Sequence, residues 1–457
     1  MREALLSHVA AAVGGRIRGQ DATVSSVIID SRGARPGALF FALPGERGDG
    51  HEFVADAFER GAEAAVVHRE VESPGPTVMV ADTEQALSDL AAHERGALRA
   101  TVIGITGSTG KTITKDLTAA ILGSRFDVVA SAASFNNEIG LPLTVLEAEP
   151  RTEVLVCEMG SRGIGHIEKL CRVARPDIGV VTNVGEAHMD LFGSRENIAR
   201  AKGELVECLP ESGTAVLNAD DQVVRGYAGR TAARILTFGT ARDADVRADD
   251  IDLDEEGRAR FKLAAGGERE HVELATPGAH MVENALAAAA CGVALGLSAA
   301  ECAAALKGAR ISRWRMETFT TPQGIRVVND AYNANPTSVA AALKSARWMS
   351  RGGRCIAVLG HMAELGPISD EEHARVGGLV ARLGFDALVT VGPDAVPIAH
   401  AAVREGLHPN ELTICETPAE ALDAVRRLAR RGDVVLVKAS RIARLEQIAE
   451  GLAGEGA

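Results

Sequence analysis

The chain has 457 residues, a formal net charge of -13 and only 3% aromatic residues. This length exceeds one ordinary domain and predicts about three, while the acidic balance and the scarcity of rings exclude a nucleic-acid surface of basic patches and stacking aromatics. Seven scattered cysteines without a C-x-x-C pair predict buried free thiols in a reducing compartment. No stretch approaches the roughly 18 apolar residues of a membrane span and the N-terminus lacks a signal-peptide core, so we expect a cytoplasmic protein with no membrane insertion.

The first 83 residues alternate short apolar runs with turn residues. Strands are predicted within 24–30, 38–50, 62–68 and 76–82, and a helix within 51–62. We therefore expect a small N-terminal α/β domain over residues 1–83.

The middle of the chain alternates strand-like and helical patterns. A helix predicted over 83–98 precedes a strand at 100–106, and buried runs at 153–160, 177–185 and 214–221 follow. Because such alternation is typical of parallel sheets, we predict a central parallel-sheet domain over residues 84–311.

The last segment repeats this pattern. A strand pair turning at Pro322 to Gly324 precedes a predicted helix over 336–349 and buried strands within 354–360, 387–392 and 433–440. The pattern indicates a C-terminal Rossmann-like domain over residues 312–457, and hence an α/β protein of three domains.

A glycine-rich turn, GITGSTGKT at residues 104–112, lies between a predicted strand and a predicted helix ending at Gly123. The common phosphate-binding loop has its first glycine where this chain has Ile105. The strand-turn-helix context still presents backbone N–H groups to phosphate, so we predict an ATP-binding P-loop rather than a turn without ligand. Lys111 is expected to contact the phosphates and Thr112 to ligate Mg²⁺, with the loop formed by Thr106, Gly107, Ser108, Thr109 and Gly110.

Two further candidate metal ligands follow predicted strands. Glu158 ends one strand and His188 follows the next. Because ligands collect at the carboxyl ends of parallel strands, we expect both side chains to join Thr112 in holding Mg²⁺. Capping or surface roles are the alternative for either residue alone.

Lys202 lies on the inward stripe of the helix predicted between Ser194 and Pro210, together with Ile198, Leu205, Val206 and Leu209. Spacing alone favours a lysine whose ammonium reaches solvent. The alternative is a desolvated neutral amine that reacts with CO₂ to give a metal-binding carbamate.

Six further segments accompany the loop in order: FNNEIGLPLTVL (135–146), EMGSRGIGHI (158–167), VVTNVGEAHMDLFGS (180–194), AKGEL (201–205), HMVENALAA (280–288) and NDAYNANPTS (329–338). Together with the shifted loop, whose spacing is normal there, they resemble the Mur ligase family, the ATP-dependent amide-forming enzymes of peptidoglycan precursor synthesis. The resemblance spans essentially the whole chain and favours carbamylated Lys202.

Within the family, the chain is most similar to the type that joins D-alanyl-D-alanine to UDP-N-acetylmuramoyl-tripeptide (UDP-MurNAc-tripeptide) through an acyl phosphate. A tripeptide-forming member, a folylpolyglutamate synthase and a nucleotide-binding protein without ligase activity remain alternatives. We expect a monomer.

The resemblance assigns roles by position. Lys111, Glu158, His188 and Lys202 would be catalytic, and Thr112, Glu158, His188 and Lys202 would hold metal. Further ATP contacts would be Asn284, Arg315 and Asp330, although Asn284 as a helix-packing amide is the alternative. Substrates would contact Ser31, Arg32, Asp49, Gly50, His51, Asn136, Asn137, Asn333 and Asn335. Trp314 stands where many relatives carry glycine, and His361 replaces a frequent aspartate.

Overall fold

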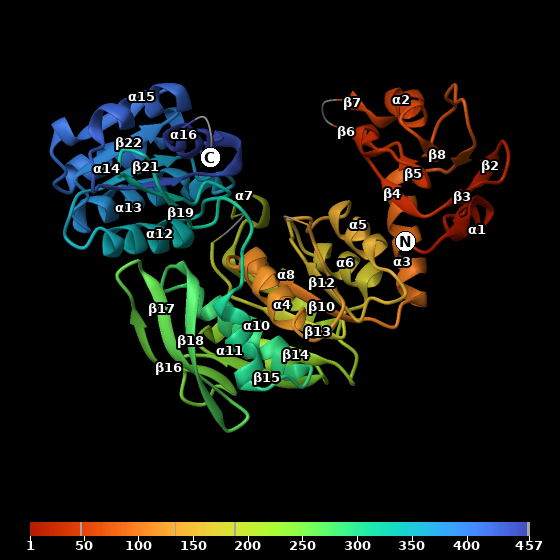
Figure 1. Cartoon of the computed structure of the whole chain (residues 1–457), viewed down its shortest axis with the longest axis horizontal. Helices are drawn as coiled ribbons and strands as arrows, with labels where there is room; N and C mark the ends of the chain where they lie inside the picture. Colours follow the sequence, from red (N-terminus) through yellow and green to blue (C-terminus); the bar gives the residue numbers. More distant parts are fainter. Residues whose placement is uncertain (46–47, 133, 187–188, 455–457) are drawn as a thin grey trace.

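The computed structural model describes residues 1–45, 48–132, 134–186 and 189–454. Three sheets with their helices succeed one another along the chain, as the red, orange-to-green and teal-to-blue parts of Figure 1 show. The sequence prediction of an α/β protein with several parallel sheets is confirmed. Within the described part, no helix is long and apolar enough to cross a bilayer.

The first sheet has the order β2-β9-β8-β5-β4, parallel except for the antiparallel pair of β2 and β9. Each of the four apolar runs predicted as strands contains one. The strands are β2 (Arg16–Arg18), β4 (Ser26–Ile28), β5 (Ala38–Phe41), β8 (Ala62–Val67) and β9 (Thr77–Met79), with short pairs β1 (Ala4–Leu5) and β3 (Thr23–Val24), and β6 (Pro44–Gly45) and β7 (Gly48–Asp49). The helices are α1 (Leu6–Ala12), η1 (Ser31–Gly33), η2 (Gly50–Phe53) and α2 (Val54–Glu59).

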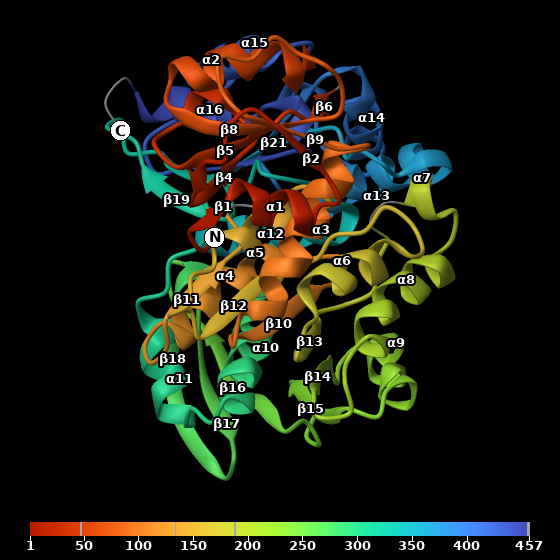
Figure 2. The ribbon, with the colours of Figure 1, turned by 90° about the vertical axis from the view of Figure 1, so that its right-hand side faces the viewer.

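Helix α3 (Thr83–Ala97) connects the first sheet to the central one (Figure 1, Figure 2). It begins where the Asp82 carboxylate accepts hydrogen bonds from the N–H groups of Glu84 and Gln85. Its apolar face, including Leu87 and Leu90, joins one core cluster with residues of both neighbouring units. The helix therefore belongs to the packing of both.

The central sheet has the order β11-β12-β10-β13-β14-β15-β16-β17-β18. Its parallel strands are β10 (Thr101–Thr106), β11 (Val128–Ala130), β12 (Val154–Glu158), β13 (Ile178–Val181), β14 (Thr214–Asn218) and β15 (Arg234–Gly239). The helices are α4 (Lys111–Leu122), α5 (Gly140–Glu147), α6 (His166–Ala174), α7 (Met189–Phe192), α8 (Arg195–Glu207), α9 (Gln222–Arg225), η3 (Gly226–Arg230), α10 (Met281–Ala294) and α11 (Ala299–Lys307).

The sheet continues as an antiparallel extension that the sequence prediction did not contain. Strand β16 (Val246–Leu253) pairs with β17 (Arg258–Ala265), which pairs with β18 (Glu268–Pro277). The β17–β18 connection is Gly266 and Gly267, both with positive φ, which is too short for a helical crossover. A Gly-Gly pair between strands is a hairpin signal, so the uniform alternation predicted through about residue 310 is wrong over β16 to β18.

The third sheet has the order β19-β20-β24-β21-β22-β23, with β19 antiparallel and the others parallel. Its strands are β19 (Glu317–Thr320), β20 (Arg326–Asn329), β21 (Cys355–Gly360), β22 (Ala387–Val391), β23 (Leu412–Cys415) and β24 (Val434–Lys438). The helices are α12 (Pro336–Met349), η4 (Gly366–Ile368), α13 (Ser369–Arg382), η5 (Pro393–Ala395), α14 (Val396–Arg404), η6 (Pro409–Glu411), α15 (Pro418–Leu428), η7 (Arg441–Ala443) and α16 (Glu446–Ala453). The predicted turn at Pro322 to Gly324 joins β19 to β20.

All seven cysteines are free thiols, and all except the half-buried Cys208 are buried. They contribute apolar volume to the cores, as the sequence predicted.

Candidate active site

The predicted phosphate loop joins β10 to α4, and two of its glycines leave no room for a side chain. A Cβ on Gly107 would lie 1.9 Å from Thr182 Oγ1, and one on Gly110 would lie 2.1 Å from Asn284 Oδ1. Both glycines also have positive φ, 150° and 79°. A Cβ on Gly104 would instead meet Leu205 and Met159 below the sheet, so this first glycine serves packing.

The loop is fastened to the end of the neighbouring strand β13. Asn183 Oδ1 accepts hydrogen bonds from the backbone N–H (2.9 Å) and the hydroxyl (3.1 Å) of Thr109, and Thr182 donates to the Thr109 carbonyl at 2.6 Å. Ser108 exchanges hydrogen bonds with Gly185, and the Thr106 hydroxyl donates to the Met159 carbonyl below the loop. The sequence analysis missed Thr182 and Asn183, whose signal was their place directly after a buried strand.

The predicted catalytic Lys111 begins α4 and folds back over the loop. Its Nζ donates to the Gly107 carbonyl at 2.8 Å. Burial lowers the pKa of Lys111, while nearby Glu158 raises it and Arg315 lowers it further. The side chain is thus confined to the space above the loop glycines, where a bound phosphate would meet it.

Arg315 from the third unit reaches the first turn of α4. Its Nη2 donates to Thr112 Oγ1 at 2.8 Å and to Ser134 Oγ at 3.1 Å, and its guanidinium lies 4.1 Å from the centre of the Tyr332 ring. Within the described ranges, the buried Nε has no hydrogen-bond partner. Arg315 was predicted to bind ATP and Thr112 to bind Mg²⁺. The structure brings these two residues together although 203 positions separate them in the sequence.

The linker leading to Arg315 is also attached to α4. The backbone N–H and the hydroxyl of Ser312 both donate to Asp116 Oδ2 at 2.8 Å. Asp116 lies one helical turn after Thr112, so the linker contacts the same face of α4 twice. Trp314 and Met316, on either side of Arg315, have φ of 60° and 52°, a conformation that costs about 1 kcal/mol or more for residues other than glycine.

Glu158 lies at the carboxyl end of β12, next to β10, and is 1% exposed. Its Oε1 accepts a hydrogen bond from Asn136 Nδ2 at 2.8 Å, whereas its buried Oε2 has no partner among the residues that the structure describes. A buried carboxylate oxygen without a donor is costly, and a cation would satisfy it. Glu158 therefore fits the predicted metal site, and Asn136 lies beside it.

His188, the other predicted imidazole ligand, lies outside the described residues. Within the described ranges, no cluster of three or more histidine, cysteine, aspartate or glutamate side chains could hold a metal. A metal at Glu158 would therefore need other oxygen ligands, such as Thr112 or a modified lysine.

Lys202 is 1% exposed, so the prediction from spacing that it snorkels to solvent is wrong. The whole predicted stripe of α8 is buried, and Ser194 caps the helix by accepting a hydrogen bond from the Asn197 N–H. The Lys202 Nζ donates to Ser161 Oγ at 2.9 Å. Burial holds the pKa of Lys202 well below its usual value, and the charge of Lys111 lowers it further. A neutral amine is the form that reacts with CO₂.

Two residues further along α8, Glu204 fixes the segment that carries Ser161. Its carboxylate accepts hydrogen bonds from the backbone N–H groups of Gly165 at 2.6 Å and Glu168 at 3.1 Å. These groups belong to the first turn of α6, so Glu204 caps that helix from another element.

Asn284, predicted to meet adenine, packs against the loop. Its Oδ1 accepts from the Thr114 hydroxyl at 3.3 Å and its Nδ2 donates to the His280 carbonyl at 3.1 Å. These contacts match the alternative of a packing amide, and an adenine contact stays a prediction.

Asp330 lies at the end of β20 and pairs with Lys438 at 2.5 Å. Lys438 also donates to the Asn333 carbonyl at 2.9 Å. Asn335 begins α12, where its Oδ1 accepts from the Ser338 N–H, so its side chain has a local capping function. Asn137 likewise accepts from the Gly140 N–H at the start of α5.

The predicted sugar-nucleotide residues lie in the first unit and are mostly engaged locally. Asp49 accepts from the backbone N–H and from Nδ1 of His51, and from Arg69. Burial lowers the pKa of His51, whose Nε2 accepts from the His68 N–H. Gly50 packs its backbone on Leu43, Ser31 is buried, and Arg32 is exposed and pairs with Asp30. Substrate binding by this group stays a prediction.

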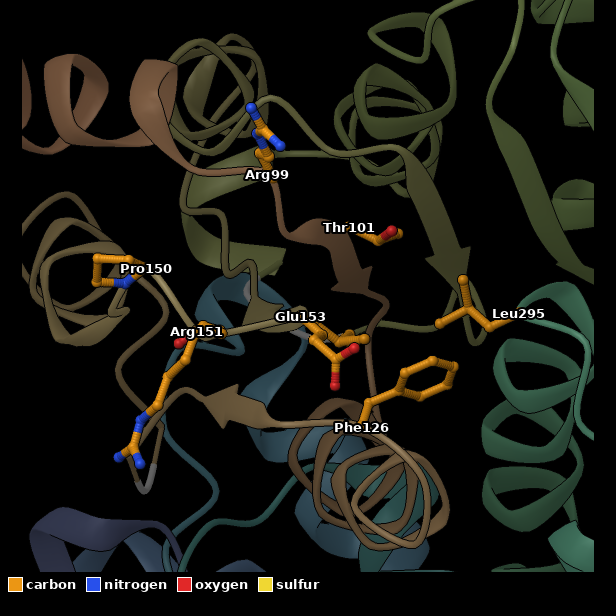
Figure 3. A pocket seen from close by; sticks show the side chains of 9 residues that line it. Arg99, Thr101, Phe126, Pro150, Arg151, Glu153 and Leu295 are labelled. Atoms are coloured by element: carbon orange, nitrogen blue, oxygen red, sulfur yellow. The ribbon is translucent and has the colours of Figure 1, made fainter.

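A cavity of about 310 Å³ lies at the amino ends of strands β10 and β12 of the central sheet (Figure 3). Thr101, Glu153, Phe126 and Leu295 contribute to its lining. It lies at the far ends of the strands from the phosphate loop and is separate from the candidate active site.

Residues 23–95, 105–292 and 314–441 match the family descriptions "Mur ligase family, catalytic domain", "Mur ligase middle domain" and "Mur ligase, glutamate ligase domain". The chain is 42% identical to a Mycobacterium tuberculosis protein named UDP-N-acetylmuramoyl-tripeptide--D-alanyl-D-alanine ligase, over 100% of this chain and 98% of that protein. The chain belongs to the Mur ligase family. A Bacillus subtilis Mur ligase of the same name is 37% identical, over 95% of this chain and 94% of that protein.

Solved Mur ligase structures have the same fold. MurF from Acinetobacter baumannii superposes with a TM-score of 0.88 at 30% identity, covering 100% of both chains. MurF from Thermotoga maritima, solved in complex with ADP, superposes with a TM-score of 0.82 at 29% identity, covering 94% of this chain and 98% of that one. The predicted membership of the Mur ligase family and the predicted fold class are thus confirmed.

Proposed function

We propose that this Mur ligase joins D-alanyl-D-alanine to the terminal carboxylate of UDP-MurNAc-tripeptide, with conversion of ATP to ADP and phosphate. The names of the Mycobacterium tuberculosis and Bacillus subtilis relatives support these two substrates, and the Thermotoga maritima complex with ADP supports ATP as the nucleotide. The observation that carries the proposal is the buried Glu158 carboxylate oxygen, without a partner in the described part of the chain, beside a phosphate loop; the buried Lys202 amine, whose pKa the charge of Lys111 lowers further, supports it.

In the proposed reaction, the tripeptide carboxylate attacks the γ-phosphorus, and ADP leaves. The resulting acyl phosphate is attacked by the dipeptide amine, and phosphate leaves. The phosphate loop of residues 106–110 and the Lys111 ammonium bind and orient the transferred phosphoryl group. No side-chain nucleophile takes part.

The residues present fit a divalent cation, since Glu158 has an oxygen to offer and Thr112 a hydroxyl. Thr112, Glu158, His188 and carbamylated Lys202 would hold Mg²⁺, which when bound offsets the negative charge that develops on the phosphoryl group. Ser161 would orient the modified lysine from 2.9 Å.

The three units take separate parts in this proposal. Residues 1–83 would bind the UDP-sugar end, residues 84–311 ATP, and residues 312–457 the dipeptide and, through Arg315 and Asp330, the nucleotide. Asn284 would meet the adenine, and Asn136, Asn137, Asn333 and Asn335 would lie near the peptides. We expect the enzyme to work as a cytoplasmic monomer.

The test is phosphate release with ATP, Mg²⁺ and UDP-MurNAc-tripeptide, with and without D-alanyl-D-alanine, together with the mass of the product. We expect dipeptide-dependent release and a pentapeptide product. Equal release without the dipeptide, or with a single amino acid in its place, contradicts the proposal and favours another amide ligase of the family. Absence of substrate-dependent hydrolysis favours a nucleotide-binding protein without ligase activity.

A further inference from the structure

The segment following β21 lies at the carboxyl edge of the third sheet and contacts the central unit. The Asp190 N–H donates to the Glu364 carbonyl at 3.2 Å, and a Cβ on Gly366 would lie within 3.0 Å of Asp190. Arg375 on α13 lies 3.7 Å from Glu186. Figure 1 shows α7 beside the third unit. These contacts attach the segment to the part of the central unit that follows β13.

His361 is the first residue of this segment, and its backbone and ring are held in place. Its carbonyl accepts a hydrogen bond from the Ser440 N–H at 2.9 Å, and its ring stacks on His373 with centroids 5.3 Å apart and an interplanar angle of 16°. His373 is itself fixed, because Nε2 accepts from the Met362 N–H at 2.9 Å and Nδ1 donates to the Ser369 carbonyl at 2.7 Å. The His361 ring therefore rests on a rigid neighbour.

The ring nitrogens of His361 are uncommitted. Nδ1 is buried without a hydrogen-bond partner, with Asp394 Oδ2 at 3.9 Å, and no hydrogen bond to Nε2 occurs among the residues described. The charged or titratable groups that face the ring are His373 from α13 and Asp394 from η5. A fixed imidazole with open nitrogens at the carboxyl edge of a Rossmann-like sheet lies where such sheets bind ligands.

The proposed reaction needs a group that accepts a proton from the attacking amine. The α-amino group of a peptide is mostly an ammonium ion at neutral pH and has no lone pair with which to attack. Imidazole exchanges protons in this pH range. The roles assigned above to the phosphate- and metal-binding residues leave this proton without an assigned acceptor.

We infer that His361 is the proton acceptor for the incoming amine. The inference rests on the proposed function. The ammonium gives one proton to the imidazole, and the freed lone pair forms the C–N bond with the acyl phosphate carbonyl carbon. As the C–O bond to phosphate breaks, phosphate leaves with that electron pair and takes up a second proton from nitrogen. The imidazolium then releases its proton to solvent.

The test compares two variants of equal size, His361→Asn and His361→Asp, because only the carboxylate can accept a proton. Each is assayed with D-alanyl-D-alanine and with hydroxylamine, a nucleophile that is largely unprotonated at neutral pH and traps the acyl phosphate as a hydroxamate. His400→Asn, an exposed histidine of the same unit, is the matched control. Thermal unfolding of every variant verifies folding.

We expect His361→Asn to lower turnover with the dipeptide by about 100-fold or more, the usual range for a lost general base. Hydroxamate formation should stay within about threefold of wild type, and His361→Asp should exceed His361→Asn with the dipeptide by about tenfold. Equal dipeptide turnover in wild type and His361→Asn, equal activity of the two variants, or parallel loss of hydroxamate overturns the assignment. A wild-type chain without dipeptide-dependent activity instead refutes the ligase proposal and, with it, this role.

Discussion

Replacing Lys202 with methionine tests whether the folded chain holds a neutral lysine. The side chain is 1% exposed, its Nζ donates a hydrogen bond to Ser161, and burial keeps its pKa well below the usual 10.5. An unfolded lysine binds a proton that the folded one does not, so folding is penalised below pH 10.5, and the penalty shrinks as pH rises. Each pH unit between the two pKa values changes the free energy of unfolding by about 1.4 kcal/mol.

Methionine fills similar volume and does not titrate. As pH rises from the lowered pKa of Lys202 toward 10.5, wild type should therefore gain stability relative to Lys202→Met, by about 1.4 kcal/mol per pH unit, although the variant should lose its ligase activity. The measurement is urea unfolding monitored locally, through the hydrogen exchange of amides in α8. A local probe is needed because a chain of several domains has no single unfolding free energy. Lys169→Met, on the exposed face of α6, is the control.

Parallel pH curves for wild type, Lys202→Met and Lys169→Met would refute the reasoning. Added bicarbonate provides a second arm of the same experiment. If the neutral amine forms a carbamate, bicarbonate should stabilise wild type but not Lys202→Met, since CO₂ would bind only the folded state.

Three further changes have expected outcomes. Gly110→Ala should destabilise α4 by about 2–4 kcal/mol, through its positive φ and the displaced Asn284; combining it with Asn284→Ala should recover part of the loss in hydrogen exchange, and strict additivity would contradict the clash. Glu204→Ala leaves two N–H groups of α6 without an acceptor, so exchange in its first turn should accelerate by a factor equivalent to about 2–4 kcal/mol, and unchanged exchange would show that the cap is unimportant. Hydrogen bonds from His51 hold the pKa of Asp49 well below 3.8. This stabilisation is complete above about pH 4 and is lost as pH falls through the lowered pKa, so the destabilisation by Asp49→Asn, followed by circular dichroism, should shrink below pH 4; a constant difference would contradict the linkage.

Local patterns predicted much of the fold. Turn residues and apolar runs located strands in each of the three sheets, although β2, β11, β15 and β23 were not predicted, and every residue of the predicted inward stripe between Ser194 and Pro210 is buried. The antiparallel strands β16 to β18 were missed because the alternation of strands and helices seen earlier in the central domain was assumed to continue through them. The Gly266-Gly267 hairpin turn contradicts that assumption.

The candidate site was predictable where chemistry follows from one short segment, as in the phosphate loop. It was not predictable where partners come from distant segments. The hydrogen bond from Arg315 to Thr112, the contact of Lys202 with Ser161 and the burial that decides the state of Lys202 depend on tertiary packing. Asn335 and Asn137 accept hydrogen bonds from backbone N–H groups at the starts of α12 and α5, a common local use of asparagine, and their predicted place near the substrates stays a prediction.

The linker is attached to α4 at two positions, so the orientation of this helix constrains the start of the C-terminal unit. Thr112 at its first turn and Asp116 one turn later both hold the strand of chain from which the last third of the protein hangs. A ligand that displaces the first turn of α4, or that replaces Arg315 as the partner of the Thr112 hydroxyl, would alter the attachment of the C-terminal unit to this helix.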